Sequence, residues 1–405
     1  MKKRFNIATV VGLVLLAAAL SFMFTYFAVE RQFESILQTE QSEAKKLQKV
    51  SRVLSIIENE FVGDYDYDTL LDGAAAGIIA ATGDRWSFYM TAEDYKSYMQ
   101  SSQNAYVGIG TTVVYDAENE GILITRIHDS SPAQTAGLQP RDLIVSVDGT
   151  KVSEVGYSAA VEMVRGEEGT SVTLGVISAG QTSARSVTVE RKSYQYNPIS
   201  SEIIEGNIGY MRIDNFDEHA AAYFGDALDK LLAANVEGLI FDVRNNGGGH
   251  KSEMVEMLDR LCPEGPLFIM RDKAGQESVD YSDANEVDLP MVVIVNQDSY
   301  SAAEFFAAAL REYGKALIVG VETSGKGYAQ QTRLLGDGSA MNISVNEYFT
   351  PNGNSLVGTG VSLDLEVEQQ SDKNLYLLER DEDTQFTAAL NLLKQQMKGG
   401  FNTEG

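Results

Sequence analysis

The chain has very few of the residues that most often form cross-links or bind transition metals. Cys262 is the only cysteine among 405 residues, so neither an intramolecular disulfide nor a cysteine-based zinc site can form. The three histidines, His128, His219 and His250, are scattered without the spacing of a dedicated metal site. We therefore expect no metal and no other cofactor.

Positive charge is also scarce. The chain has 32 Lys and Arg against 58 Asp and Glu, which gives a net charge of −26. A nucleic-acid-binding protein needs basic residues to neutralise phosphates, so we expect no nucleic-acid partner. Hydrophobic residues make up 44% of the chain and charged residues 22%, which is typical of a globular protein with two or three domains.

The amino terminus has the pattern of a membrane anchor. Basic residues at positions 2–4 precede a charge-free, largely apolar run over residues 7–29. Crossing a bilayer takes roughly 20 apolar residues, whereas a cleaved signal peptide has an apolar region of roughly 7 to 15. The length favours an anchor, although cleavage after residues 17–19 stays open as an alternative. The positive-inside rule then places residues from 31 onward outside the cytoplasm of a bacterial cell.

The hydrophobic pattern divides the chain into five predicted segments. They are a cytoplasmic stub and transmembrane anchor at 1–29, a helical region at 30–104, a compact mixed domain at 105–192, an α/β domain at 193–370, and a C-terminal helix and tail at 371–405. In the helical region, Leu47, Val50, Leu54 and Ile57 recur at helical spacing. Helices with such an apolar face can pair in a homodimer, although a purely structural role for them stays open.

The mixed domain combines short β-like runs with one helix near residues 158–164. The runs lie at 121–127, 142–147 and 172–177. Alone, the segment Tyr106, Val107, Gly108, Ile109 and Gly110 fits an ordinary hairpin. With Ser-Pro-Ala at 131–133, Ala-Gly-Leu at 136–138 and Val-Asp-Gly at 147–149, it resembles a PDZ domain, although Arg141 stands where glycine is common. The resemblance implies that residues 106–110 bind the C-terminus of a protein tail, which joins the sheet as an added strand.

The α/β domain alternates strand-like and helical runs. Strands are predicted at 208–213, 238–243, 292–295 and 316–321, and helices at 224–234, 254–261 and 301–313. This alternation predicts a largely parallel sheet. After residue 326 the pattern becomes β-like, and residues 374–397 are predicted to form a closing helix.

Ser301 follows a predicted buried strand and opens an alanine-rich helix. A helix N-terminus favours negative charge, so a tetrahedral oxyanion could form there, with the amide of Ala302 as one donor. The glycine-rich turn at 245–249 ends the neighbouring strand and could supply a second donor at Gly249. Serine is also a common helix cap, and glycines are common in turns, so a purely structural role stays open.

Lys326 lies between two glycines and is a candidate general base. Its ordinary pKa of about 10.4 would have to fall by roughly three pH units, and burial is the available means. Gln330, four residues on, would share a strand face with Lys326 and could orient its amine. An exposed loop lysine is the plain alternative, and His250 is a rival base without an evident carboxylate partner.

Residues 320–326 also reproduce most of a phosphate-binding P-loop. Gly327 stands where Ser or Thr would bind Mg²⁺, and a β-like pattern follows in place of a helix. We therefore reject nucleotide binding.

The order of these pieces resembles the C-terminal-processing peptidases, also called tail-specific proteases. The motifs that carry the resemblance lie at residues 83–90, 209–216, 239–249, 299–304, 325–327 and 348–353, together with the PDZ motifs. In that family the nucleophile is the middle serine of Ser-x-Ser-x-x-Glu, and the base is a lysine 25 residues further on. Ser301 and Lys326 match both positions. The resemblance also implies a catalytic Gln330 and a possible accessory acid at Glu312.

The resemblance further implies a parallel-sheet, superhelical, crotonase-like core with an inserted PDZ domain. Its expected activity is that of a membrane-anchored serine endopeptidase that captures unfolded C-termini and cleaves through an acyl-enzyme. Four departures are Gly247, Tyr300, Ala303 and Ser324, none of which removes a group that the dyad needs, although Tyr300 could narrow the substrate pocket. A proteolytically inactive PDZ scaffold is the alternative from a different functional class.

Overall fold

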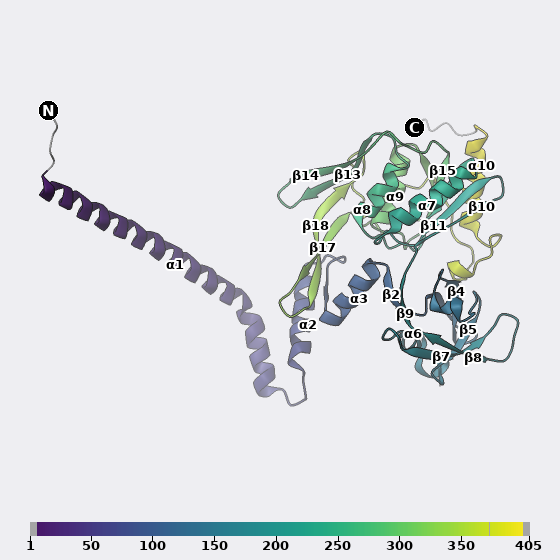
Figure 1. Cartoon of the computed structure of the whole chain (residues 1–405), viewed down its shortest axis with the longest axis horizontal. Helices are drawn as coiled ribbons and strands as arrows, with labels where there is room; N and C mark the ends of the chain where they lie inside the picture. Colours follow the sequence, from purple (N-terminus) through teal and green to yellow (C-terminus); the bar gives the residue numbers. More distant parts are fainter. Residues whose placement is uncertain (1–5, 372, 400–405) are drawn as a thin grey trace. The chain divides into compact units, whose positions relative to one another are not determined.

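The computed structural model describes residues 6–371 and 373–399. The chain forms two compact units, Met1–Thr82 and Gly83–Gly405 (Figure 1). Residues 1–5 of the predicted stub and residues 400–405 of the predicted tail lie outside the described residues.

Two helices make up the first unit. They are α1 (Ile7–Glu60) and α2 (Tyr67–Ala80). The predicted anchor and the first predicted helix after it form one continuous helix, because neither glycine nor proline occurs between residues 13 and 60. α2 begins after Asp66, whose carboxylate accepts hydrogen bonds from the amide and the hydroxyl of Thr69, both at 2.8 Å.

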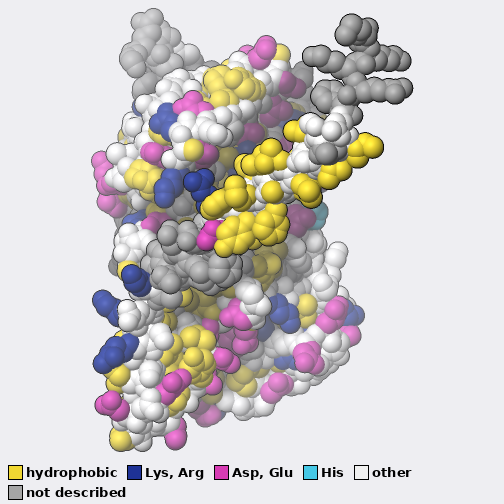
Figure 2. Space-filling model, turned by 90° about the vertical axis from the view of Figure 1, so that its left-hand side faces the viewer, with side chains coloured by type: hydrophobic (Ala, Val, Ile, Leu, Met, Phe, Trp, Pro, Cys, Tyr) yellow, Lys and Arg dark blue, Asp and Glu magenta, His cyan; other side chains and the backbone are white. Residues whose placement is uncertain are grey.

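One stretch of α1, Thr9–Gln32, is long and apolar enough to cross a membrane by length and composition. Its 24 residues are unburied, and Figure 2 shows their hydrophobic side chains in yellow along the helix. A signal sequence has the same properties, so this segment fits both interpretations of the amino terminus.

The second unit starts with a short strand and a helix, β1 (Phe88–Met90) and α3 (Ala92–Ser102). β1 lies inside the region predicted to be helical, because it pairs antiparallel with a distant strand, β18 (Ala340–Phe349). α3 begins at Thr91, where the Thr91 hydroxyl and the Asp94 carboxylate each accept a hydrogen bond from the other residue's amide.

A six-stranded antiparallel sheet forms the core of the mixed domain. Its strands are β3 (Thr111–Asp116), β4 (Gly121–Ile127), β5 (Leu143–Val147), β6 (Thr150–Lys151), β7 (Ser171–Ile177) and β8 (Arg185–Glu190), in the order β3-β4-β5-β7-β8 with β6 on β5. Its helices are α4 (Pro132–Thr135), α5 (Val152–Val155) and α6 (Tyr157–Val164). The predicted β-runs and helix are confirmed. Arg141 takes the positive φ of 73° that glycine would adopt more easily.

The chain enters and leaves this domain through a two-stranded ribbon. Its strands are β2 (Ala105–Gly108) and β9 (Lys192–Gln195), which pair antiparallel.

A second six-stranded sheet forms the core of the α/β domain. Its strands are β10 (Ile199–Ile204), β11 (Ile208–Ile213), β12 (Gly238–Asp242), β15 (Met291–Val295), β16 (Ala316–Gly320) and β19 (Leu365–Glu366), in that order. All neighbouring strands are parallel except β10 and β11. The predicted parallel core is therefore confirmed.

Alternation along these strands builds two hydrophobic layers. On β15, Met291, Val293 and Val295 pack with the helices α7 (Ala220–Ala233), α8 (Lys251–Asp259) and α9 (Ala302–Glu312). Val292 and Ile294 face the opposite layer, which contains α10 (Thr384–Met397). In Figure 1, α10 is the yellow helix beside the sheet. Because both faces are covered, the central strands β15 and β16 are apolar along their whole length.

The closing helix begins ten residues later than predicted. Residues Leu375–Leu377 form only a short 3₁₀ turn, and α10 starts after Asp383, whose carboxylate accepts the amide of Phe386 at 3.0 Å. Asp383 also pairs with the buried Arg244. This tertiary contact fixes the start of the helix, and the apolar pattern of the sequence could not show it.

A third sheet carries the remaining part of the site. Its order is β1-β18-β13-β14 with β17 on β18, where β13 is Gly265–Asp272, β14 is Glu277–Ser282 and β17 is Tyr328–Leu334. β1 pairs with β18, and Arg85, just before β1, donates to Ser324 C=O in the loop that precedes β17.

Candidate active site

Ser301 stands at the junction between a buried strand and a helix. β15 ends at Val295, and α9 begins directly after Ser301. The backbone of Ser301 has φ 59° and ψ −121°, a conformation that a non-glycine residue rarely adopts. Such strain persists only where surrounding contacts impose it, and it is common at functional sites.

The glycine-rich turn at residues 245–249 lies against Ser301. A Cβ added to Gly248, whose φ is +91°, would lie 2.8 Å from the Cβ of Ser301 and 2.9 Å from the amide nitrogen of Ala302. At Gly249 an added Cβ would lie 2.4 Å from the carbonyl carbon of Phe216. Only glycine allows this approach. The predicted donors Ala302 and Gly249 are thus on neighbouring backbone segments.

Hydrogen bonds direct the Gly249 amide away from the adjacent chain. Gly248 C=O accepts the amide of Phe216 at 2.8 Å, and His250 N–H donates to Phe216 C=O at 2.7 Å. In this parallel bridge the intervening Gly249 N–H points the other way. Among the described residues, neither Gly249 N–H nor Ala302 N–H has a hydrogen-bond partner. Both amides therefore remain available to an acceptor in the cavity.

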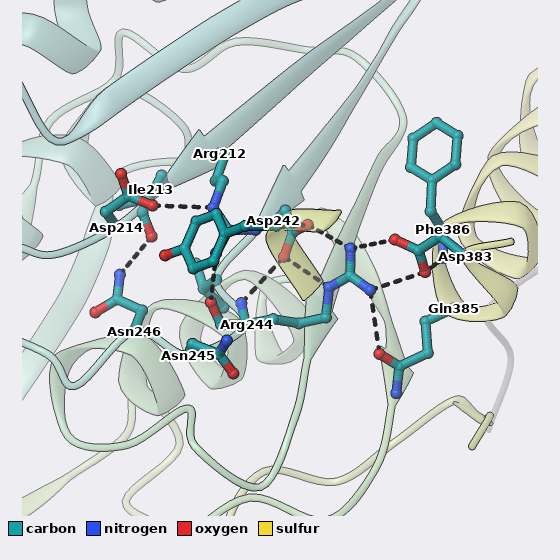
Figure 3. A network of polar contacts seen from close by, with 12 residues as sticks. Arg212, Ile213, Asp214, Asp242, Arg244, Asn245, Asn246, Asp383, Gln385 and Phe386 are labelled. Carbon is teal, nitrogen blue, oxygen red and sulfur yellow. Dashed lines mark hydrogen bonds and ion pairs between the residues drawn. The ribbon is translucent and has the colours of Figure 1, made fainter. Parts of the chain in front are cut away.

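A buried network of charges and amides holds the turn (Figure 3). Arg244 donates to the carboxylates of Asp242 and Asp383 at distances of 2.6 to 2.9 Å. Burial alone would raise the pKa of Asp242, but Arg244 and Arg212 hold it well below its usual range.

Amide side chains continue this network into the turn itself. Asn245 N–H donates to the Asn296 side chain at 2.9 Å, and the Asn246 side chain accepts Gly248 N–H at 2.8 Å. These hydrogen bonds hold Asn245, Asn246 and Gly248 in place while the Gly249 amide stays available.

Glu304 connects the serine to the lysine loop. Its carboxylate is fully buried, with 0% of the residue exposed. One oxygen accepts Ser301 N–H at 3.0 Å and Lys326 N–H at 2.9 Å, and the other accepts Gly325 N–H at 2.7 Å and the Thr323 hydroxyl at 2.6 Å. Burial raises the pKa of Glu304, and these four donors oppose the rise. One carboxylate thus fixes the backbones of both predicted dyad residues.

The ammonium group of Lys326 lies among aromatic rings. Its Nζ is 4.8 Å from the ring centroid of Trp86 and 5.8 Å from that of Tyr300. Burial lowers the pKa of Lys326 to about 8, although the charges of Asp84 and Glu304 oppose this effect. To act as a general base, Lys326 needs a pKa close to neutrality, well below the ordinary value of a lysine. Burial supplies most of this decrease in its pKa.

One cavity of about 700 Å³ brings the predicted residues together. Ser301, Ala302, Lys326, Gln330 and Gly249 all line it. Apolar and aromatic side chains form much of the rest, including Trp86, Phe88, Met254, Phe268, Tyr300 and Tyr348. A partly apolar cavity beside a serine and a lysine can hold a peptide side chain next to these groups.

Gln330 reaches the cavity by a different route from the one predicted. Lys326 precedes β17 by two residues, and the register of β17 shifts between Ala329 and Gln330. The sequence predicted that Lys326 and Gln330 share one face of a strand. They do not, because Lys326 lies outside β17. The Gln330 amide donates to Tyr328 C=O at 2.7 Å and to the Ser344 hydroxyl at 3.1 Å, which fixes its orientation.

Glu312 lies in a separate cavity of about 410 Å³. Its carboxylate accepts the hydroxyl of Thr350 at 2.7 Å, the amide of Asn352 at 2.8 Å and the side chain of Asn354 at 2.8 Å. These contacts place the predicted accessory acid on the turn at residues 350–354, away from the serine and the lysine.

His250 lines the main cavity, and its Nε2 lies 2.8 Å from the Ser102 hydroxyl and 3.1 Å from the Ser102 carbonyl oxygen. A carboxylate that the sequence did not reveal lies nearby. Burial raises the pKa of Asp217 to about 7, and the neighbouring His250 opposes the rise. β17 follows Lys326, where a P-loop would need a helix.

The predicted tail-binding residues 106–110 lie at the start of the mixed domain. Ile109 C=O accepts Ala133 N–H at 2.7 Å, and Gly110 C=O accepts His128 N–H at 3.1 Å, so the loop packs against α4 and the end of β4. The next strand, β3, is at the edge of its sheet. A free edge is where an extended peptide can add as a further strand.

Sequence reasoning missed several residues around the lysine. Asp84 and Trp86 belong to a family motif that the sequence showed, but no spacing connected that motif with Lys326. Glu304 was visible only as the last residue of Ser-x-Ser-x-x-Glu, and Tyr348, whose hydroxyl donates to Lys326 C=O, as part of the motif at 348–353.

Within residues 6–371 and 373–399, no group of three or more His, Cys, Asp or Glu side chains is placed to hold a metal ion.

Comparison with known proteins agrees with this geometry. Three family models match the chain: the CtpB N-terminal domain of activating proteases at residues 14–94, the PDZ domain at 97–177, and peptidase family S41 at 207–367. Carboxy-terminal processing protease CtpB of Bacillus subtilis is 30% identical over 91% of this chain and 74% of its own length. The chain belongs to this family of carboxy-terminal processing serine proteases.

Other relatives extend the comparison. "Probable CtpA-like serine protease" of Staphylococcus aureus (strain COL) is 28% identical over 92% of this chain and 74% of its own length. A solved S41 protease structure from Bacteroides fragilis is 20% identical and aligns with a TM-score of 0.61 over 84% of this chain and 93% of that one. The fold is therefore that of an S41 peptidase with a PDZ domain.

Proposed function

We propose that this chain is a membrane-anchored endopeptidase that processes the C-terminal segments of proteins with a Ser301–Lys326 dyad. The observation that carries the proposal is the Glu304 carboxylate, which binds the backbone amides of both residues beside one cavity. A buried lysine whose pKa has fallen to about 8 is neutral in roughly a tenth of molecules at pH 7, which suits a general base.

Acylation begins when Ser301 Oγ attacks the carbonyl carbon of the scissile peptide bond. As that C–O bond forms, the hydroxyl proton moves to the lone pair of Lys326 Nζ. The amides of Ala302 and Gly249 donate to the resulting oxyanion, and the helix dipole of α9 adds to this stabilisation. The C–N bond then breaks, and Lys326 gives its proton to the leaving amine.

Deacylation repeats these roles with water. Lys326, neutral again, takes a proton from a water molecule that attacks the ester carbon. The C–O bond to Ser301 breaks, the proton passes to Ser301 Oγ, and the new carboxyl terminus leaves. The hydrogen bonds of Gln330 support an orienting role for its amide beside Lys326.

The PDZ domain would select substrates by binding their free C-termini at residues 106–110. The position of β3 at the edge of its sheet supports this assignment, since an unfolded tail can pair there as an extra strand. The catalytic domain would have the superhelical, crotonase-like arrangement expected of the family. Residues 1–29 would anchor the chain in a bacterial membrane with the catalytic domain outside, and the apolar helices after the anchor would support a homodimer.

The test uses the full-length chain in detergent micelles and an unfolded protein with a tagged C-terminus. Wild-type protein should cleave the substrate, whereas Ser301→Ala should bind the tail without cleaving it. Mass spectrometry of a rapidly quenched reaction should show the acyl-enzyme on Ser301. Binding without cleavage by the wild type would support the inactive PDZ scaffold, and equal cleavage by Ser301→Ala would rule out the dyad.

A further inference from the structure

Trp86 is the only tryptophan in the chain, and its ring borders the candidate base. The Lys326 ammonium lies 4.8 Å from the Trp86 ring centroid, and Tyr300 borders it from 5.8 Å. The two rings are 5.5 Å apart and inclined by 34°. The charges of Asp84 and Glu304 also act on Lys326, since both raise its pKa against the effect of burial. Two aromatic faces therefore border the ammonium in addition to these two carboxylates.

Hydrogen bonds on both sides hold Trp86 in place. Its amide donates to the Asp84 carboxylate at 3.0 Å, and the Ser87 hydroxyl, which accepts Ser344 N–H at 3.0 Å, donates to the same carboxylate. Arg85 donates to Ser324 C=O at 3.1 Å, two residues before Lys326. The backbone at Trp86 and its neighbours is thus tied both to β18 and to the lysine loop, which positions the ring beside the base.

The position of the two rings beside Lys326 is important because a general base must be neutral at rest and positively charged in the transition state. Before reaction it must be neutral, and burial favours that form. In the transition state it gains a positive charge, and an adjacent carboxylate would stabilise this charge but would also keep the resting lysine protonated. The face of an aromatic ring attracts a cation more weakly than a carboxylate does. A ring can therefore stabilise the developing ammonium while leaving a useful fraction of the lysine neutral.

We propose, resting on the peptidase function above, that Trp86 and Tyr300 form an aromatic clamp that stabilises the Lys326 ammonium as it accepts the Ser301 proton. Trp86 acts through the base and is a positioning residue. In this step the Ser301 O–H bond breaks, the N–H bond forms on Lys326 Nζ, and the resulting cation lies over the two rings until its proton passes to the leaving amine.

Fluorination of tryptophan tests the clamp directly. Fluorine withdraws electron density from the ring and weakens its attraction for a cation, with little change of size. Because the chain has one tryptophan, biosynthetic incorporation of mono-, di- and trifluorotryptophan into the full-length protein changes position 86 alone. The pKa of Lys326 is read without substrate, as the midpoint of the pH dependence of tryptophan fluorescence.

The clamp predicts a graded response. Each fluorine removes stabilisation from the ammonium, so the midpoint should move to lower pH, by about one pH unit across the series. The high-pH plateau of kcat/KM should fall in step, by about threefold to tenfold. Tyr300→Leu should lower the midpoint further, whereas Tyr300→Phe, which keeps the ring, should leave it in place.

Other groups near the cavity can titrate or carry charge, so the transition has to be assigned. These groups are Asp84, Arg85, Asp217, His250, Lys251, Glu304, Tyr98, Tyr300 and Tyr348. Lys326→Met is the control, and it should abolish the fluorescence transition. A transition that survives in Lys326→Met, or a midpoint that does not move across the fluorinated series, would overturn the clamp.

The clamp and the peptidase function can fail separately. If no form of the protein cleaves a substrate, the peptidase function fails, while the fluorescence midpoint still decides whether the rings hold the ammonium. If cleavage is normal and the midpoint and plateau are unchanged by fluorination, only the clamp fails.

Discussion

The two halves of the proposed dyad are built in different ways. Ser301 is placed by elements that are adjacent in sequence: a buried strand, a short turn and the helix α9. Lys326 lies in a loop whose surroundings come from distant segments, namely Trp86, Glu304 and Tyr348. The nucleophile therefore depends on local backbone geometry, and the base depends on tertiary burial.

This difference explains how the two halves act. A serine needs a position and oxyanion donors, which a strand, a turn and a helix N-terminus provide. A lysine needs an altered pKa, and only distant groups that exclude water can provide it. Glu304 joins the two halves, because it is local to the serine by sequence and binds the lysine loop in space.

The largest effect is expected from removing the base. Lys326→Met should lower kcat/KM by at least about 10⁴-fold, since serine is a weak nucleophile without proton removal. The same substitution should stabilise the fold by about 1 to 2 kcal/mol at pH 7, because burial of the mostly charged amine is unfavourable. Thermal unfolding of both proteins at pH 7 measures this gain. A loss of stability would show that Lys326 is a structural residue.

A smaller effect should follow from Glu304→Gln. The substituted amide keeps the size of the side chain, but its NH₂ group cannot accept the donors that one carboxylate oxygen now binds. We expect kcat/KM to fall about 100-fold and stability to fall by about 2 kcal/mol, measured by steady-state kinetics and urea unfolding.

Glu312→Gln is the matched control on the same helix. Its carboxylate binds the turn at 350–354, so stability should fall by about 1 to 2 kcal/mol while kcat/KM at 25 °C stays within about threefold of wild type. An activity loss as large as that of Glu304→Gln would contradict the separate roles of these two acids.

The smallest effect is expected at Gln330. Gln330→Ala removes an amide that lines the cavity and bonds to Tyr328 and Ser344. If this amide orients the lysine, kcat should fall about tenfold with little change in KM. A rise in KM at constant kcat would instead assign Gln330 to substrate binding.

Much of the structure around Ser301 could be predicted from the sequence. The apolar strand, the alanine-rich helix and the glycine turn each have a local pattern, and the structure places Ser301, Ala302 and Gly249 together. The walls around Lys326 could not be predicted, because the contact between Ser87 and Ser344 spans 257 residues of sequence. The start of α10 was misplaced for a similar reason, since it depends on the ion pair between Asp383 and Arg244.

The central claim is that buried Lys326 activates Ser301, and the pH dependence of Ser301 acylation tests it most directly. The rate at which a fluorophosphonate modifies Ser301 should rise with pH to a plateau, with a midpoint close to the Lys326 pKa of about 8. The midpoint should be unchanged in His250→Ala, and the reaction should be lost in Lys326→Met. A midpoint that disappears in His250→Ala, with reactivity retained in Lys326→Met, would contradict the account.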